Sequence, residues 1–308
     1  MSYVLLIVGF LLLVKGADWF VEGSSSLAKR LRVPSVVIGL TIVAMGTSAP
    51  EAAVSITAGL KGNNAIAFGN IVGSNLFNLL AIVGICALLK PSRAELPIVK
   101  RDFPVSIAAT VLLILFVAGD FCIGRIEGLI LLVCMIVYIV YLIYQARKNP
   151  LAVEQDEIKT LALWKCLLFL VLGLGMIIFG GTLVVDNASV IAKSLGLSDN
   201  LIGLTIVAIG TSLPELVTSV TAARKGDSGL ALGNVVGSNI FNILFILGFS
   251  SILTPVAITG ESMIDVILLL CVTVAFYLPL LKKNYTGRVY GALGVLAYVL
   301  YTVYIILR

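Results

Sequence analysis

The chain has 308 residues, of which 60% are hydrophobic and only 12% are charged. This balance excludes a soluble globular domain and indicates a polytopic membrane protein embedded in the lipid bilayer. The net charge of +5 does not indicate nucleic-acid binding, because the basic residues lie in the loops between apolar stretches. We therefore expect no nucleic-acid partner.

A spanning helix needs roughly 20 apolar residues, and ten stretches of the chain are candidates. The first has no basic region before it and no small-residue cleavage site, so we expect a retained span rather than a signal peptide. The ten expected spans are residues 2–27, 35–60, 65–89, 103–119, 124–146, 161–192, 199–223, 228–253, 262–281 and 288–307. They predict an all-α polytopic membrane protein with ten transmembrane helices.

A polar segment divides these spans into two groups of five. We expect residues 1–146 to form a first five-helix repeat, 147–160 a cytoplasmic linker, and 161–308 a second five-helix repeat. Because five is odd, the second group enters the membrane with the opposite orientation, so the repeat is inverted. With both termini outside, the inner loops carry 16 lysines and arginines and the outer segments carry four, which satisfies the positive-inside rule.

The most informative feature is an internal repeat. Residues 39–78 match residues 203–242 at a constant offset of 164, and 25 of these 40 positions are identical. Each copy carries the run Gly-Thr-Ser-x-Pro-Glu within an apolar span, ending at Glu51 and at Glu215. Carboxylates are costly in a membrane helix and indicate function there. Their duplication predicts one pseudo-symmetric site between the two halves.

The repeat supplies oxygen atoms on shared helix faces. In the first copy, Thr47, Ser48 and Glu51 are spaced i, i+1 and i+4, which puts them on one side of a helix. Pro50 lacks an N–H, so we expect carbonyl oxygens around residues 44–47 to lose their helical partners. The next helix adds a polar stripe, and the second copy repeats both sets. The stripe and its repeat are Asn70, Ser74, Asn75 and Asn78, then Asn234, Ser238, Asn239 and Asn242.

This chemistry suits hard cations. The site would hold two carboxylates with hydroxyl, amide and carbonyl oxygens, and calcium takes about 6–8 oxygen ligands in flexible geometry. Histidine is absent from the chain, which excludes imidazole ligands and histidine-dependent catalysis. Two adjacent carboxylates in a low dielectric repel unless cations or protons neutralise them. We therefore expect one ion to leave only when another replaces it.

The runs GTSAPE, GTSLPE, GNIVGSNLFN and GNVVGSNIFN resemble the two α-repeats of the sodium/calcium exchanger branch of the calcium/cation antiporter superfamily, in its prokaryotic form. The resemblance implies a sodium/calcium antiporter that works by alternating access, with calcium and sodium as transported ions. It implies no enzyme activity, no cofactor and no obligatory protein partner. It also implies a multi-pass plasma membrane protein in which the first and sixth helices slide across the remaining bundle.

The resemblance also implies a ligand set. Glu51 and Glu215 would be the central calcium ligands, helped by the backbone carbonyls of Thr47 and Thr211. The residues implied for sodium are Ala44, Thr47, Ser48 and Ser74 in one half, and Ala208, Thr211, Ser212 and Ser238 in the other. Asn78 and Asn242 complete the centre. The potassium-dependent branch is typically acidic at the position of Asn242, so the asparagine here argues against potassium cotransport.

Other interpretations stay open at this point. A proton-coupled calcium or divalent cation antiporter could use the same carboxylates, although the duplicated Thr-Ser pairs favour sodium. A channel fits an inverted repeat poorly, and an intramembrane serine hydrolase would lack a histidine. The asparagines Asn70, Asn75, Asn234 and Asn239 are equally well explained as contacts between helices. Asp102 is interpreted as a loop charge, and Tyr138 as an anchor at the membrane interface.

Overall fold

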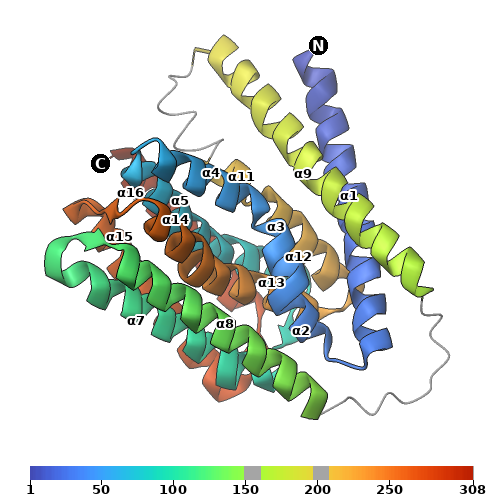
Figure 1. Cartoon of the computed structure of the whole chain (residues 1–308). Helices are drawn as coiled ribbons and strands as arrows, with labels where there is room; N and C mark the ends of the chain where they lie inside the picture. The colour runs from blue at the N-terminus through green and yellow to red at the C-terminus, as the bar shows by residue number, and fades with distance from the viewer. Residues whose placement is uncertain (149–160, 197–207, 308) are drawn as a thin grey trace.

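The computed structural model describes residues 1–148, 161–196 and 208–307, and these residues are predominantly helical (Figure 1). Among them, eight helical stretches are long and apolar enough to cross a membrane, and a bent helix pair makes a ninth. The expected span 199–223 lies partly outside the described residues. The multi-pass, all-helical membrane fold is thus confirmed, whereas the exact number of ten spans stays a prediction.

Six of the expected transmembrane spans are single uninterrupted helices, and their bounds match the expected ones to within a few residues. They are α1 (Ser2–Leu31), α7 (Phe103–Asp120), α8 (Arg125–Lys148), α9 (Leu163–Ser194), α15 (Gly260–Lys283) and α16 (Arg288–Leu307). Short antiparallel strand pairs join the loops at their ends. These are β1 (Ser92–Arg93) with β4 (Tyr285–Thr286), and β2 (Cys122–Ile123) with β3 (Val256–Ala257).

Two further spans contain a widened, π-helical turn in the middle. The first runs through α5 (Asn64–Leu76), η2 (Phe77–Ile82) and α6 (Val83–Leu89). The second runs through α13 (Ser228–Phe241), η5 (Asn242–Leu247) and α14 (Gly248–Leu253). In the most apolar 18-residue stretch of these two spans, 83% and 94% of the residues are buried, whereas the corresponding share in the other single spans is at most 39%. They therefore form the centre of the bundle, and the remaining helices separate them from lipid.

The expected helix 35–60 is broken rather than continuous. It consists of α2 (Ser35–Ile38), η1 (Gly39–Val43), α3 (Ala44–Thr47) and α4 (Ala49–Leu60), with a bend of 48° between α3 and α4. The break lies at Ser48, and Pro50 falls in the first turn of α4, where its missing N–H costs no helical hydrogen bond. The repeat copy behaves alike: α11 (Ala208–Thr211) and α12 (Leu213–Lys225) meet at Ser212.

Helices α1 and α9 form a long pair along one edge of the molecule (Figure 1). Their contact depends on glycines, because the backbones approach too closely for a side chain. A Cβ built on Gly173 would lie 2.7 Å from the Phe20 nitrogen and 2.8 Å from the Gly16 carbonyl oxygen. Gly9 and Gly180 meet in the same way further along the pair. Small residues at such crossings are typical of membrane helices that pack without intervening side chains.

The interpretations of Asp102 and Tyr138 are wrong. A π-helical turn, η3 (Ile98–Asp102), extends the fourth span upstream, so Asp102 lies inside the protein and is fully buried. Its carboxylate accepts hydrogen bonds from Arg101 Nε at 2.6 Å and from the Tyr138 hydroxyl at 3.0 Å. A buried charge needs such partners, and a sequence pattern does not show that they are available.

The glycine contact predicts a position-specific effect of one methyl group. Gly173→Ala should lower the free energy of unfolding by about 1–3 kcal/mol, because overpacking forces α1 and α9 apart. Gly175→Ala is the matched control on the same helix, since a Cβ there meets nothing within 4 Å. Thermal unfolding of the purified protein in detergent would measure both. Equal midpoints for the two variants would contradict the proposed packing.

Candidate cation-binding site

The two Gly-Thr-Ser-x-Pro-Glu motifs meet at the helix breaks in the middle of the bundle. Glu51 lies in the first turn of α4 and Glu215 in the first turn of α12. Their exposed fractions are 1% and 0%. Each carboxylate therefore lies at a helix N-terminus, where the helix dipole favours negative charge, but is removed from bulk water.

Each carboxylate is bonded by the serine of the other motif. Ser48 Oγ donates to Glu215 Oε1 at 2.8 Å, and Ser212 Oγ donates to Glu51 Oε1 at 2.8 Å. Ser74 Oγ also donates to Glu51 Oε1, at 3.4 Å. This reciprocal bonding holds the two acidic residues in one site, although they are 164 positions apart in the sequence.

The threonines bond to asparagines of the opposite half. Thr47 Oγ1 donates to Asn234 Oδ1 at 3.0 Å, and Thr211 Oγ1 donates to Asn70 Oδ1 at 3.3 Å. Asn70 Nδ2 donates in turn to Ser55 Oγ, and Asn234 Nδ2 donates to Ser219 Oγ, each at 2.9 Å. Both ends of each amide are therefore engaged. This favours a packing role for Asn70 and Asn234 over ligation.

The other asparagines form a lattice between the two central spans. Asn78 Nδ2 donates to Asn239 Oδ1 at 3.1 Å, and Asn242 Nδ2 donates to Asn75 Oδ1 at 2.9 Å. Asn78 is the second residue of the π-helical turn η2, and Asn242 is the first residue of η5. Such turns are frequent at functional sites, because they displace one residue from the regular helical ladder.

Several buried oxygens of this region have no hydrogen-bond donor among the described residues. They are Glu51 Oε2, Glu215 Oε2, Asn78 Oδ1, Asn242 Oδ1 and Ser238 Oγ. Buried polar atoms are otherwise almost always paired, and carboxylate and amide oxygens can only accept. The arrangement thus lacks positive charge, and a desolvated hard cation would supply it. The Thr218 hydroxyl, one turn after Glu215, also has no partner among the described residues, and the sequence pattern did not indicate it.

The expected backbone oxygens are only partly available. The Ala44 carbonyl accepts the Ser48 N–H at 3.0 Å and the Thr47 hydroxyl at 3.4 Å, so the break at Ser48 does not leave it unbonded. In the second copy, the Ser212 N–H bonds to the Ile209 carbonyl instead. Ala208 is the first residue of α11, and its side chain lies outside the described part of the chain.

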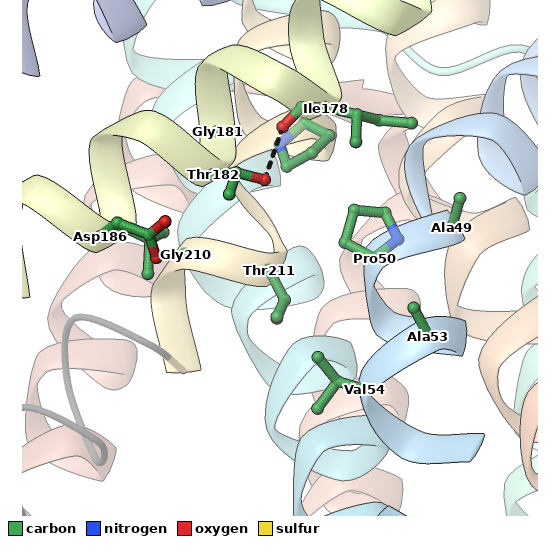
Figure 2. Close-up of a pocket in the computed structure, with 12 residues that line it drawn as sticks. Ala49, Pro50, Ala53, Val54, Ile178, Gly181, Thr182, Asp186, Gly210 and Thr211 are labelled. Atoms are coloured by element: carbon green, nitrogen blue, oxygen red, sulfur yellow. Dashed lines mark hydrogen bonds between the residues drawn. The ribbon is translucent and has the colours of Figure 1, made fainter. Parts of the chain in front are cut away.

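A cavity of about 390 Å³ lies beside the site, between α4, α9 and the α11–α12 break (Figure 2). Pro50 and Val54 line it from α4, and Thr211 and Pro214 line it beside Glu215. Asp186 stands on α9, toward the end of that helix at Ser194. Thr182 donates to the Ile178 carbonyl at 3.1 Å. Most other lining groups are apolar.

Comparison with known proteins agrees with these features. A family model described as sodium/calcium exchanger protein matches residues 1–145 and 165–307. The chain is 42% identical over 308 residues to the putative antiporter CaxA of Alkalimonas amylolytica, covering 97% of this chain and 96% of that protein. It is 35% identical over 300 residues to the sodium/calcium exchanger MaX1 of Methanosarcina acetivorans, covering 85% and 86% respectively.

A solved structure of the sodium-calcium exchanger NCX_Mj, soaked without sodium and calcium, superposes with a TM-score of 0.85. The two chains are 31% identical, and the match covers 97% of each. The family is one of transporters rather than enzymes. The resemblance inferred from the two motifs is therefore confirmed, and the chain belongs to the sodium/calcium exchanger family.

Proposed function

We propose that this protein exchanges sodium for calcium across the membrane by alternating access. The observation that carries the proposal is the set of buried, unpaired oxygens around Glu51 and Glu215. Two carboxylates match the charge of one calcium ion. When calcium leaves, their mutual repulsion in a low dielectric requires sodium ions in its place, and this requirement couples the two fluxes.

The proposed ligands are the residues that the motifs supply. Glu51 and Glu215 bind calcium together with the backbone oxygens of Thr47 and Thr211. Sodium binds to hydroxyl and backbone oxygens around the carboxylates, and Asn78 and Asn242 complete the centre. The sodium ligands are Ala44, Thr47, Ser48, Ser74, Ala208, Thr211, Ser212 and Ser238. Both ions are cargo, so the mechanism needs no cofactor.

We also propose that the chain is an inverted repeat with ten spans, residues 1–146 forming one half and 161–308 the other. Three features support it. The serine–glutamate bonds are reciprocal. The two glycine contacts between α1 and α9 are equivalent under the offset of 164. Gly9 corresponds to Gly173 and Gly16 to Gly180, so the contact of Gly9 with Gly180 maps onto that of Gly173 with Gly16. Strands β1 and β3 are also related by 164 positions. Both termini would then lie outside a plasma membrane.

We infer a route by which ions reach the site. The cavity between α4 and α9 leads to Thr211 and Pro214, and we infer that it admits ions from outside. On the opposite side, Lys225 Nζ of α12 lies 3.2 Å from the Asp18 carboxylate of α1 and donates to its carbonyl oxygen at 2.9 Å. This contact ties α1 to the bundle, so sliding of α1 and α9 toward the inward-facing state must break it.

Neutralising either central carboxylate tests the site. Glu51→Gln and Glu215→Gln should each reduce calcium exchange by about a hundredfold or more. Each removes a carboxylate that would pair with the buried calcium ion, and losing one partner of a buried pair of opposite charges costs about 3–5 kcal/mol. The amide has nearly the same volume, so the fold should persist. Calcium-45 uptake into sodium-loaded proteoliposomes measures the effect, with Glu127→Gln in α8 as the control. Retained exchange in either site variant would refute the assignment.

The ion pair predicts a local change in dynamics. Lys225→Met should increase amide hydrogen exchange in α1 around Asp18, because the tie that holds this segment against α12 is removed. Lys61 occupies the equivalent position in the first half, where Thr182 replaces the acidic partner. Lys61→Met is therefore the matched control and should leave exchange in α9 unchanged. Equal protection of α1 in wild type and Lys225→Met would contradict the inferred role.

A further inference from the structure

The asparagine lattice has a chemical consequence for the ions. An asparagine amide ends in an oxygen on one side and an NH2 group on the other, and the two ends have nearly the same shape. Only the oxygen can bind a cation, since the NH2 group presents partial positive charge. The affinity of a site that uses Asn78 and Asn242 therefore depends on which end of each amide faces inward.

The bonds of Asn78 and Asn242 select one orientation. Each uses Nδ2 to donate to an asparagine of the opposite half, and each leaves Oδ1 without a donor among the described residues. The acceptors are the Oδ1 atoms of Asn239 and Asn75. If either amide turned over, its oxygen would face another oxygen and the hydrogen bond would be lost. The lattice thus keeps the two oxygens free.

Asn75 and Asn239 are themselves held in place. Asn75 Nδ2 donates to the Asn239 carbonyl at 3.2 Å, and Asn239 Nδ2 donates to the Asn75 carbonyl at 3.1 Å. Their exposed fractions are 0% and 3%. Because their NH2 groups are committed to backbone oxygens, only their Oδ1 atoms are left to meet Asn242 and Asn78.

We propose that Asn75 and Asn239 are positioning residues, which orient Asn242 and Asn78 so that each presents its oxygen to the transported cation. This inference rests on the proposed exchange function. Asn75 and Asn239 do not touch the ion; each acts through the asparagine of the opposite half. Asn70 and Asn234 do not share this role, because their amides bond to Ser55 and Ser219.

The same geometry determines which side chain suits position 242. Asn75 Oδ1 requires a donor there, and an aspartate carboxylate can only accept. Turning the Asn75 amide over would provide a donor but would lose its bond to the Asn239 carbonyl. Asn75 thus favours an amide over an acid at position 242. A smaller side chain with a rotatable hydroxyl, such as serine, would remove this preference because it can donate to a carboxylate.

The first test compares three variants with the same substitution. Asn75→Leu and Asn239→Leu should raise the calcium concentration for half-maximal exchange by about tenfold or more, because one oxygen ligand turns away. Asn187→Leu is the control, since Asn187 is also buried but, among the described residues, its amide bonds to the Leu183 carbonyl of its own helix α9 alone. Thermal unfolding without ions should be similar for all three. A fall in maximal rate with unchanged half-saturation, or an equal shift in the control, would overturn the proposal.

The second test uses compensation, which a merely structural role would not produce. Asn242→Asp should weaken calcium exchange, and Asn75→Ser combined with Asn242→Asp should recover at least about half of that loss. Full activity of the single variant, or no recovery in the double variant, would overturn the positioning role. Wild-type protein is assayed alongside. Absence of sodium-dependent calcium uptake in the wild type would instead reject the proposed function itself.

Discussion

Two buried carboxylates, each hydrogen-bonded by a serine of the other half, determine the architecture around them. Ser48 holds Glu215 and Ser212 holds Glu51, so neither half of the chain completes the site alone. Two negative charges in a membrane interior are strongly unfavourable without cations. The surrounding architecture can be understood as the means of placing these charges together and of supplying the oxygens that share a cation with them.

The helix breaks and π-helical turns serve this placement. Regular helices would engage every backbone group and direct side chains along fixed rows. The breaks at Ser48 and Ser212 start new helices whose first turns carry the two glutamates. The turn η2 includes Asn78, and the turn η5 starts at Asn242. The irregular backbone is tolerated at this depth because it is enclosed by protein.

Hydropathy predicted most of the described spans, and the internal repeat predicted that the two motifs meet, because both patterns can be read directly from the sequence. The i and i+4 spacing of Thr47 and Glu51 assumed one continuous helix, whereas the chain breaks between α3 and α4, so the two residues belong to different helices. Details that depend on tertiary partners were not predictable. The buried position of Asp102 depends on Arg101 and Tyr138. The different bonding partners of Asn75 and Asn70 likewise emerge only from the packed helices. Spacing along a helix gives a face but not a hydrogen bond.

Coupled exchange is tested most directly by calcium-45 uptake into proteoliposomes that contain the wild-type protein, with sodium, proton or no ion gradient imposed. We expect calcium uptake that requires sodium inside and sodium efflux that requires calcium outside, since each ion must neutralise the carboxylates once the other has left. Uptake driven by a proton gradient alone would assign the same carboxylates to proton coupling. Uptake without any counter-ion gradient would contradict coupled exchange.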